Sequence, residues 1–160
     1  MKMRIMVPAF LALALTAAAI YSFVQRPDAS AGGLVVTKAW ARATPPGASV
    51  GAVYVTLENR GPADERLISV ASPAAKSAML HETVEEGGAS TMRESHGAIA
   101  PGNTLEMKPG GVHIMLMGLT KPLKEGEIVG VTLGLETAGN IKVEAKVAPI
   151  GADGPMQAME

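Results

Sequence analysis

Short apolar runs, broken frequently by glycine and proline, constrain the fold of this chain more than any other feature. The runs are rich in β-branched residues, and in Val50–Glu58 the residues Val53, Val55 and Leu57 alternate onto one face. Residues 32–160 contain no stretch with helical periodicity, and their turn signals recur too often for long helices. This pattern predicts an all-β antiparallel sandwich. The predicted strands are 34–40, 50–58, 66–70, 77–84, 92–95, 104–107, 112–117, 128–136 and 141–147.

The first 31 residues have a different character and predict export. Residues 1–4 form a basic head, residues 5–24 are uncharged and mostly apolar, and Ala29-Ser30-Ala31 is a small-residue cleavage site. A run of about 20 apolar residues can also span a bilayer. We therefore expect a signal peptide or membrane anchor at residues 1–31, a β-sandwich domain at 32–148 and a flexible tail at 149–160. The domain is expected outside the cytoplasm, either soluble or tethered to a membrane.

Charge and composition exclude several classes of function. Removing residues 1–31 takes away three basic residues and one acid, which moves the formal net charge from −1 to −3. No basic patch indicates binding to nucleic acid. Trp40 and Tyr54 are the only aromatic residues after residue 31, so the core must be aliphatic. The chain has no cysteine, which excludes disulfides and thiolate chemistry.

Two histidines and two methionines form the pattern His-x10-Met-x20-His-x-Met, at His81, Met92, His113 and Met115. Thioether sulfur is a soft, neutral ligand that favours Cu(I) over hard cations such as Mg²⁺ and Ca²⁺. Two neutral imidazoles and two thioethers can hold a monovalent soft ion without deprotonation of any ligand. These four residues are therefore the candidate metal ligands, and Cu(I) is the candidate ion.

Strand geometry makes a shared site plausible. In the predicted strand 112–117, His113, Met115 and Met117 point to one face, and Ile114 and Leu116 point to the other. A hairpin turn at Gly87-Gly88 would return the strand of His81 towards Met92, although the register is not readable from sequence. The alternatives stay open at this point, because a Met-x-Met pattern usually packs in a core and a strand histidine usually lies at the surface.

The remaining histidine and four further methionines have plainer interpretations. His96 is expected in an exposed loop, with a role as an extra ligand or a support of the site as the alternative. Met79 and Met107 are expected to be core or edge residues rather than ligands. Met156 and Met159 lie in the predicted tail and are expected to have no role in the site. Transient capture of copper by this pair is the alternative.

No enzyme motif competes with a metal site. The chain contains no Gly-x-Ser-x-Gly, no cysteine nucleophile and no phosphate-binding glycine loop, so we expect a protein that is not an enzyme. A blue-copper electron-transfer centre needs a cysteine thiolate and is excluded. Two alternatives remain: a copper-dependent redox enzyme, and a β-sandwich interaction module whose methionines and histidines are incidental.

The chain resembles the periplasmic copper chaperones of the PCu(A)C type across nearly all of residues 36–147. Their motif is His-x10-Met-x21-His-x-Met, and its four residues bind one Cu(I). His81, Met92, His113 and Met115 match it, except that the middle spacing here is one residue shorter, which puts a deletion within residues 93–112. The stretches that carry the resemblance are Ala39–Ala43, Gly51–Tyr54, Leu80–Glu82, Met92-Arg93 and Pro109–Leu119.

The resemblance carries expectations about fold, cargo and partner. It implies a cupredoxin-like antiparallel β-sandwich of Greek key topology. It also implies a chaperone that carries Cu(I) to a copper-accepting protein, either a subunit of a respiratory oxidase such as cytochrome c oxidase or another copper metallochaperone. It implies a location in the periplasm, either soluble or tethered to the inner membrane. We expect a monomer that meets the membrane only through residues 1–31, if they are not cleaved.

Overall fold

The computed structural model describes residues 30–95 and 97–155, which form strands and turns and no helix. Every predicted run overlaps a strand. The strands β1 (Ser30–Ala31) and β7 (Ala98–Ile99) have two residues each and are too short to show alternation in the sequence. The other strands are β2 (Leu34–Arg42), β3 (Val50–Asn59), β4 (Glu65–Ala71), β5 (Ala75–Glu86), β6 (Ala89–Glu94), β8 (Thr104–Glu106), β9 (Val112–Leu119), β10 (Ile128–Leu135) and β11 (Gly139–Ala148).

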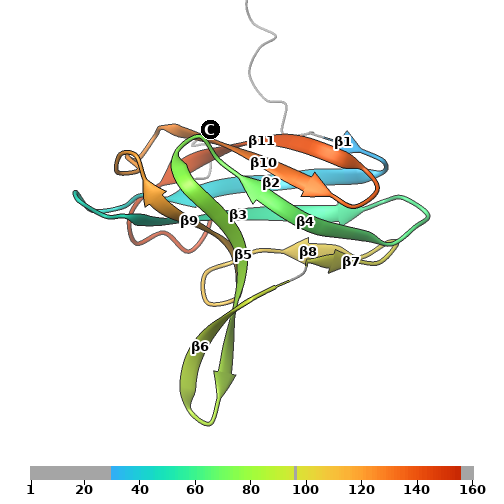
Figure 1. Ribbon diagram of the computed structural model, residues 1–160, viewed down its shortest axis with the longest axis horizontal. Helices are drawn as coiled ribbons and strands as arrows, with labels where there is room; N and C mark the ends of the chain where they lie inside the picture. The colour runs from blue at the N-terminus through green and yellow to red at the C-terminus, as the bar shows by residue number, and fades with distance from the viewer. Residues whose placement is uncertain (1–29, 96, 156–160) are drawn as a thin grey trace, which may run out of the picture.

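Seven of these strands close into a barrel (Figure 1). Their order is β2-β11-β10-β4-β5-β9-β3, and a further pairing of β3 with β2 completes the circle. The all-β prediction is confirmed, but the sheet is not wholly antiparallel. β11 pairs in parallel with β2, through Lys146–Trp40, Val147–Ala41 and Ala148–Arg42. The long chain between these two strands allows a parallel pairing, which a tight hairpin would not.

The interior of the barrel is aliphatic, as the composition predicts. Val53, Val55 and Leu57 of β3 are buried and alternate inward. A bulge between Val36 and Lys38 shifts the alternation of β2, so that Ala39 and Ala41 pair with the inward Val55 and Val53. The two aromatic residues consequently lie on the outer face of the sheet, where Trp40 stacks on Tyr54 with ring centroids 4.4 Å apart.

Two buried polar side chains fix the turns at one end of the barrel. Asn59 donates hydrogen bonds to the carbonyl oxygens of Ala63 and Ile99, both at 2.8 Å. Glu65 accepts hydrogen bonds from the hydroxyl and backbone amide of Thr137 and from the amides of two other residues, Arg66 and Ala138. Burial raises the pKa of the Glu65 carboxyl, but these hydrogen bonds outweigh it and lower the pKa from 4.5 to about 2. The carboxylate thereby ties β4 to the turn between β10 and β11.

Both ends of the described chain pack against β2. Residues 30–31, at the end of the predicted export segment, pair with Val35 and Leu34, and residues 1–29 lie outside the described part. Residues 149–155 belong to the predicted tail, yet Arg42 donates hydrogen bonds to the carbonyl oxygen of Ala152 at 3.0 and 2.6 Å and pairs with Asp153 at 3.3 Å. Residues 30–95 and 97–155 include no helix long and apolar enough to cross a membrane.

The β5–β6 hairpin projects from the barrel (Figure 1). β5 begins in the barrel wall, where it pairs with β9 as far as Glu82. Its outer part, from His81 to Glu86, pairs with β6. The predicted turn is confirmed: Gly87 and Gly88 join Glu86 to Ala89, with φ of 62° and 83°. A two-residue turn with positive φ at both positions matches the twist of the flanking strands and favours glycine. The barrel thus carries one arm, and that arm bears Met92.

Candidate metal-binding site

The sulfur and imidazole donors share one outer face of the three neighbouring strands β6, β5 and β9. Because β5 and β9 pair without a bulge from Ser77 to Glu82, each residue on one strand has a defined partner on the other. His81 lies directly opposite His113, and Met79 lies directly opposite Met115. Side chains two residues apart on a strand point to the same face, so these residues form a two-by-two block. We call this block together with Met92 the donor face.

The two imidazoles are close enough to share an ion. Their ring centroids are 6.2 Å apart, and their planes cross at 78°. On β9 the face opposite to His113 and Met115 is formed by Ile114 and Leu116, both fully buried in the core. The predicted alternation of this strand is confirmed, and it anchors the donor face rigidly to the barrel.

Backbone contacts fix the orientation of His113. Its Nδ1 lies 2.9 Å from the carbonyl oxygen of Gly111, so Nδ1 carries the proton and donates to this acceptor. The lone pair of the neutral ring is then on Nε2, where it can bind a metal. The turn before His113 closes through a hydrogen bond from the Gly111 amide to the Lys108 carbonyl oxygen at 3.0 Å. Residues 108–111 therefore set both the position and the tautomer of His113.

The Nδ1 atom of His81 is buried and has no hydrogen-bond partner within the described part of the chain. Leaving a buried polar atom without a partner costs about 1–3 kcal/mol. Such an atom therefore calls for an explanation, and a metal that accepts its lone pair would supply one. His81 and His113 thus each have one ring nitrogen available as a ligand.

Met92 lies at the margin of the donor face. It pairs with Thr83 on β5, whereas Glu94 is the residue directly opposite His81. Met92 is therefore diagonal to His81, and diagonal neighbours are typically about 7–8 Å apart across a sheet. Its side chain is 59% exposed. The structure brings His81, His113 and Met115 together and puts Met92 on the projecting arm beside them.

The other candidates fall into three groups. Met107 is 3% exposed and belongs to the core, as expected. Met79 is 42% exposed and faces Met115, a position that only the register of β5 and β9 reveals. His96, Met156 and Met159 lie outside the described residues.

Hard donors do not gather on this face. Within the described ranges, no group of three or more His, Cys, Asp or Glu side chains is placed to hold a metal ion. The further donors that share this face with the two imidazoles are the thioethers of Met79, Met92 and Met115. Thioether sulfur is a soft, neutral donor.

A row of rings continues the donor face across the outer surface of the sheet. From β2 to β5 it contains Trp40, Tyr54, His113 and His81, with 6.5 Å between the Tyr54 and His113 centroids. The Arg42 guanidinium lies 5.9 Å from the Tyr54 ring centroid. Burial raises the pKa of the Tyr54 phenol, the positive charge of Arg42 lowers it, and the negative charge of Asp153 raises it. Tyr54 therefore stays neutral and packs beside His113 as an uncharged ring.

Comparison with known proteins identifies relatives of this arrangement. The family model "Putative lipoprotein LpqE-like" matches residues 34–147. A protein of Leifsonia xyli subsp. xyli named as a putative lipoprotein is 41% identical over 125 residues, which cover 76% of this chain and 74% of that protein.

Solved structures with the same fold include PCuAC domains. The copper-bound PCuAC domain from PmoF2 is 26% identical, with a TM-score of 0.66, and the match covers 76% of this chain and 97% of that domain. Apo-DR1885 from Deinococcus radiodurans is 34% identical, with a TM-score of 0.58, and the match covers 92% and 97% of the two chains. The Cu(I) form of DR1885 is 33% identical over 79% of this chain and 83% of that one, with a TM-score of 0.58. The expected cupredoxin-like fold is confirmed.

Proposed function

Because the chain belongs to the LpqE-like family, whose fold is that of the PCuAC domains, we propose that it is a copper chaperone. The observation that carries the proposal is the His81–His113 pair, in which the buried Nδ1 atom of His81 has no hydrogen-bond partner in the described part of the chain. Met115 lies two residues from His113 on the same face of β9. The names of two solved relatives include copper, and one of them specifies Cu(I). These names support copper as the cargo of this chain.

The proposed ligands are His81, Met92, His113 and Met115, which bind one Cu(I). Nδ1 of His81 and Nε2 of His113 supply two nitrogen donors, and the methionines supply two sulfur donors. All four are neutral, so binding adds a single positive charge to the site and releases no proton when the imidazoles are already neutral. Cu(I) is preferred over Cu(II) because thioethers are soft ligands.

Carriage rather than catalysis fits the placement of the ligands. Met92 is exposed on a projecting hairpin, so an acceptor can approach the ion from this side without opening the barrel. We propose that the acceptor is a copper-binding protein, either a subunit of a respiratory oxidase or another copper metallochaperone. Exchange of one thioether for a ligand of the acceptor would begin the transfer.

The proposed location is outside the cytoplasm, in the periplasm or at the membrane facing it. Two matches carry the name lipoprotein, which supports attachment to the cell envelope. The 160 residues contain no cysteine to which a lipid could be joined through a thioether, so the apolar segment 5–24 is the proposed tether or export signal. Fusion of residues 1–35 to a reporter active only after export tests this, and a reporter that stays in the cytoplasm would refute it.

The function is tested by anaerobic titration of the chain with Cu(I) against a competing chelator. A chaperone takes up one equivalent and releases it to a chelator of higher affinity. The loaded protein is then exposed to oxygen and a reductant. Continuous oxygen consumption would instead identify a copper-dependent redox enzyme, and absence of Cu(I) uptake would leave an interaction module.

A further inference from the structure

Met79 has the geometry of a metal ligand, although it lies outside the matched motif. It is directly opposite Met115, one step along the sheet from the His81–His113 pair. Residues that face each other across antiparallel strands have Cβ atoms roughly 4.5–5.5 Å apart. Met79, His81, His113 and Met115 therefore form a compact set of two sulfur and two nitrogen donors. The whole set lies on β5 and β9 and needs no residue of β6.

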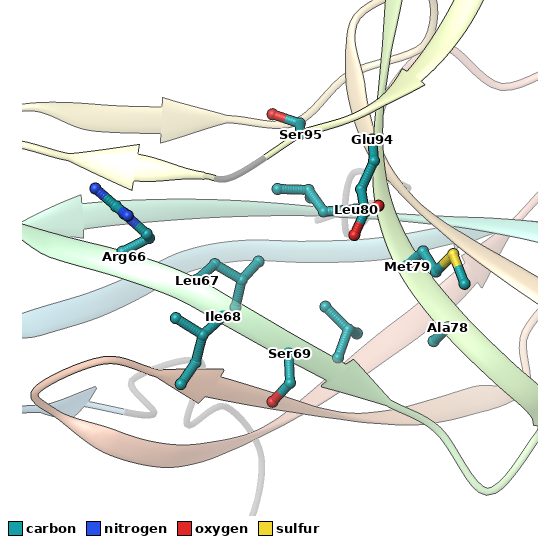
Figure 2. A pocket seen from close by; sticks show the side chains of 10 residues that line it. Arg66, Leu67, Ile68, Ser69, Ala78, Met79, Leu80, Glu94 and Ser95 are labelled. Atoms are coloured by element: carbon teal, nitrogen blue, oxygen red, sulfur yellow. The ribbon is translucent and has the colours of Figure 1, made fainter.

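The surroundings of Met79 argue against a role in core packing. Its side chain is 42% exposed, whereas the core residue Met107 is 3% exposed. Met79 borders a pocket of about 420 Å³ between β4 and β5, which pair only through Val70 and Ala78. Figure 2 shows the Met79 sulfur on the side of β5 directed away from Ile68 and Ser69. The thioether is thus free to turn towards Met115.

Met79 and Met92 lie on opposite sides of His81. On β5, Met79 is two residues before His81, and Met92 faces Thr83, two residues after it. Both residues are on the donor face, both are exposed and both carry the same neutral sulfur donor. Five donors are therefore available to an ion that needs four, and the two exposed thioethers compete for one position.

We propose that Met79 is an additional Cu(I) ligand that exchanges with Met92. The inference rests on the proposed function, because it concerns the same ion. When Met92 is bound, the ion is held at the base of the hairpin; when Met79 replaces it, the ion is held by the barrel wall alone. In the exchange one Cu–S bond forms as another breaks, and neither a proton nor an electron is transferred. Met92 is then released to move with the arm, while the ion keeps four ligands.

The test compares Met79→Leu, Met92→Leu and the double variant in the full chain, with Met107→Leu as the matched control. Each single variant should lose about tenfold or less in Cu(I) affinity, since the other methionine fills the vacant position. The double variant should lose far more than the product of the two single losses, because coupled residues are not additive. The Met107→Leu variant should bind Cu(I) like the wild type.

A double variant that binds no more weakly than Met92→Leu would overturn the proposal. Thermal unfolding of each apo variant separates a loss of ligand from a loss of fold. If His113→Ala and Met115→Leu also leave Cu(I) affinity unchanged, the proposed function fails as a whole. If they lose affinity while Met79→Leu and the double variant add nothing, only the role of Met79 fails.

A second readout observes Met79 itself. The ε-methyl carbon of a methionine reports binding of a metal to its sulfur by nuclear magnetic resonance, and Ag(I) replaces Cu(I) as a soft ion stable in air. The methyl signals of Met79, Met92 and Met115 should all shift on addition of one equivalent, and the signal of Met107 should not. A Met79 signal that stays in place while that of Met92 shifts would contradict the exchange.

Discussion

At the scale of single residues, the donor face depends on how each imidazole is held. The Gly111 carbonyl oxygen fixes the His113 tautomer, and Tyr54 packs beside the ring. His81 has no comparable partner for its Nδ1 atom in the described chain. Spacing in the sequence predicts which histidines belong together. It does not predict which ring nitrogen is available, because that is decided by a contact with the backbone of a turn.

Substitution of His113 should harm copper binding more than substitution of Met92. His113→Ala removes a buried imidazole that is already oriented and is a proposed ligand, and imidazole binds both Cu(I) and Cu(II). Met92→Leu removes an exposed thioether and should affect mainly Cu(I). Chelator competition measures Cu(I) affinity, and electron paramagnetic resonance measures Cu(II). His96→Ala serves as the control and should change neither affinity. If His96→Ala loses more copper affinity than the other two variants, the proposed ligand assignment is wrong.

Met115→Leu should separate ligation from packing. Leucine keeps the apolar volume and removes the sulfur, so the free energy of unfolding should change by less than about 1.5 kcal/mol. The Cu(I) affinity should fall by about tenfold or more if the thioether is a ligand. Urea unfolding of the apo protein measures the free energy of unfolding, and chelator competition measures the Cu(I) affinity. Unchanged Cu(I) affinity in a folded variant would return Met115 to a purely structural role.

Glu65 should make the unfolding free energy of the barrel depend on pH. Its pKa is lowered in the folded state, so its contribution is complete above pH 4.5 and is lost as the pH falls towards 2. Glu65→Gln should therefore cost about 1–3 kcal/mol of unfolding free energy at pH 7 and less at pH 3. Urea unfolding at both pH values measures the difference. Glu106→Gln, at an exposed position, is the control. If Glu65→Gln costs the same unfolding free energy at pH 7 and at pH 3, the role of the Glu65 carboxylate is contradicted.

At the scale of elements, the register between β5 and β9 creates the donor face. Alternation predicts that His113 and Met115 share a face and that Ile114 and Leu116 are buried, and this is confirmed. The hairpin turn at Gly87-Gly88 is also predicted correctly. The pairing of Met79 with Met115 is not predictable, because cross-strand register between distant segments depends on tertiary packing. For the same reason the sequence assigns Met79 to a core or edge position.

The turn of the β5–β6 hairpin should affect copper binding through Met92 alone. Gly87→Ala and Gly88→Ala each introduce a side chain at a positive φ and should destabilise the hairpin by roughly 1 kcal/mol. The double Ala variant should lose protection of the β6 amides from hydrogen exchange and should lower Cu(I) affinity no more than Met92→Leu does. Gly87→Asn is the matched control, since asparagine tolerates this conformation. If the double Ala variant loses as much Cu(I) affinity as His113→Ala, the arm contributes more to copper binding than the Met92 thioether alone.

At the scale of the whole molecule, a closed barrel supports a rigid donor face and one projecting arm. The all-β class follows from the turn signals. The closure of the sheet at β2, which pairs with β3 and in parallel with β11, does not. Alternation describes single strands, whereas closure depends on which strands meet after the chain has folded. In the proposed function the arm gives an acceptor access to the metal, while the donors on the barrel wall stay in place.

The proposed function requires this barrel to carry Cu(I) on imidazole and thioether ligands. X-ray absorption at the copper edge of the anaerobically loaded protein tests this requirement. We expect an edge typical of Cu(I) and a first shell that contains both imidazole nitrogen and sulfur, with sulfur scattering reduced in Met115→Leu. A first shell of oxygen and nitrogen without sulfur, or one that Met115→Leu leaves unchanged, would contradict it.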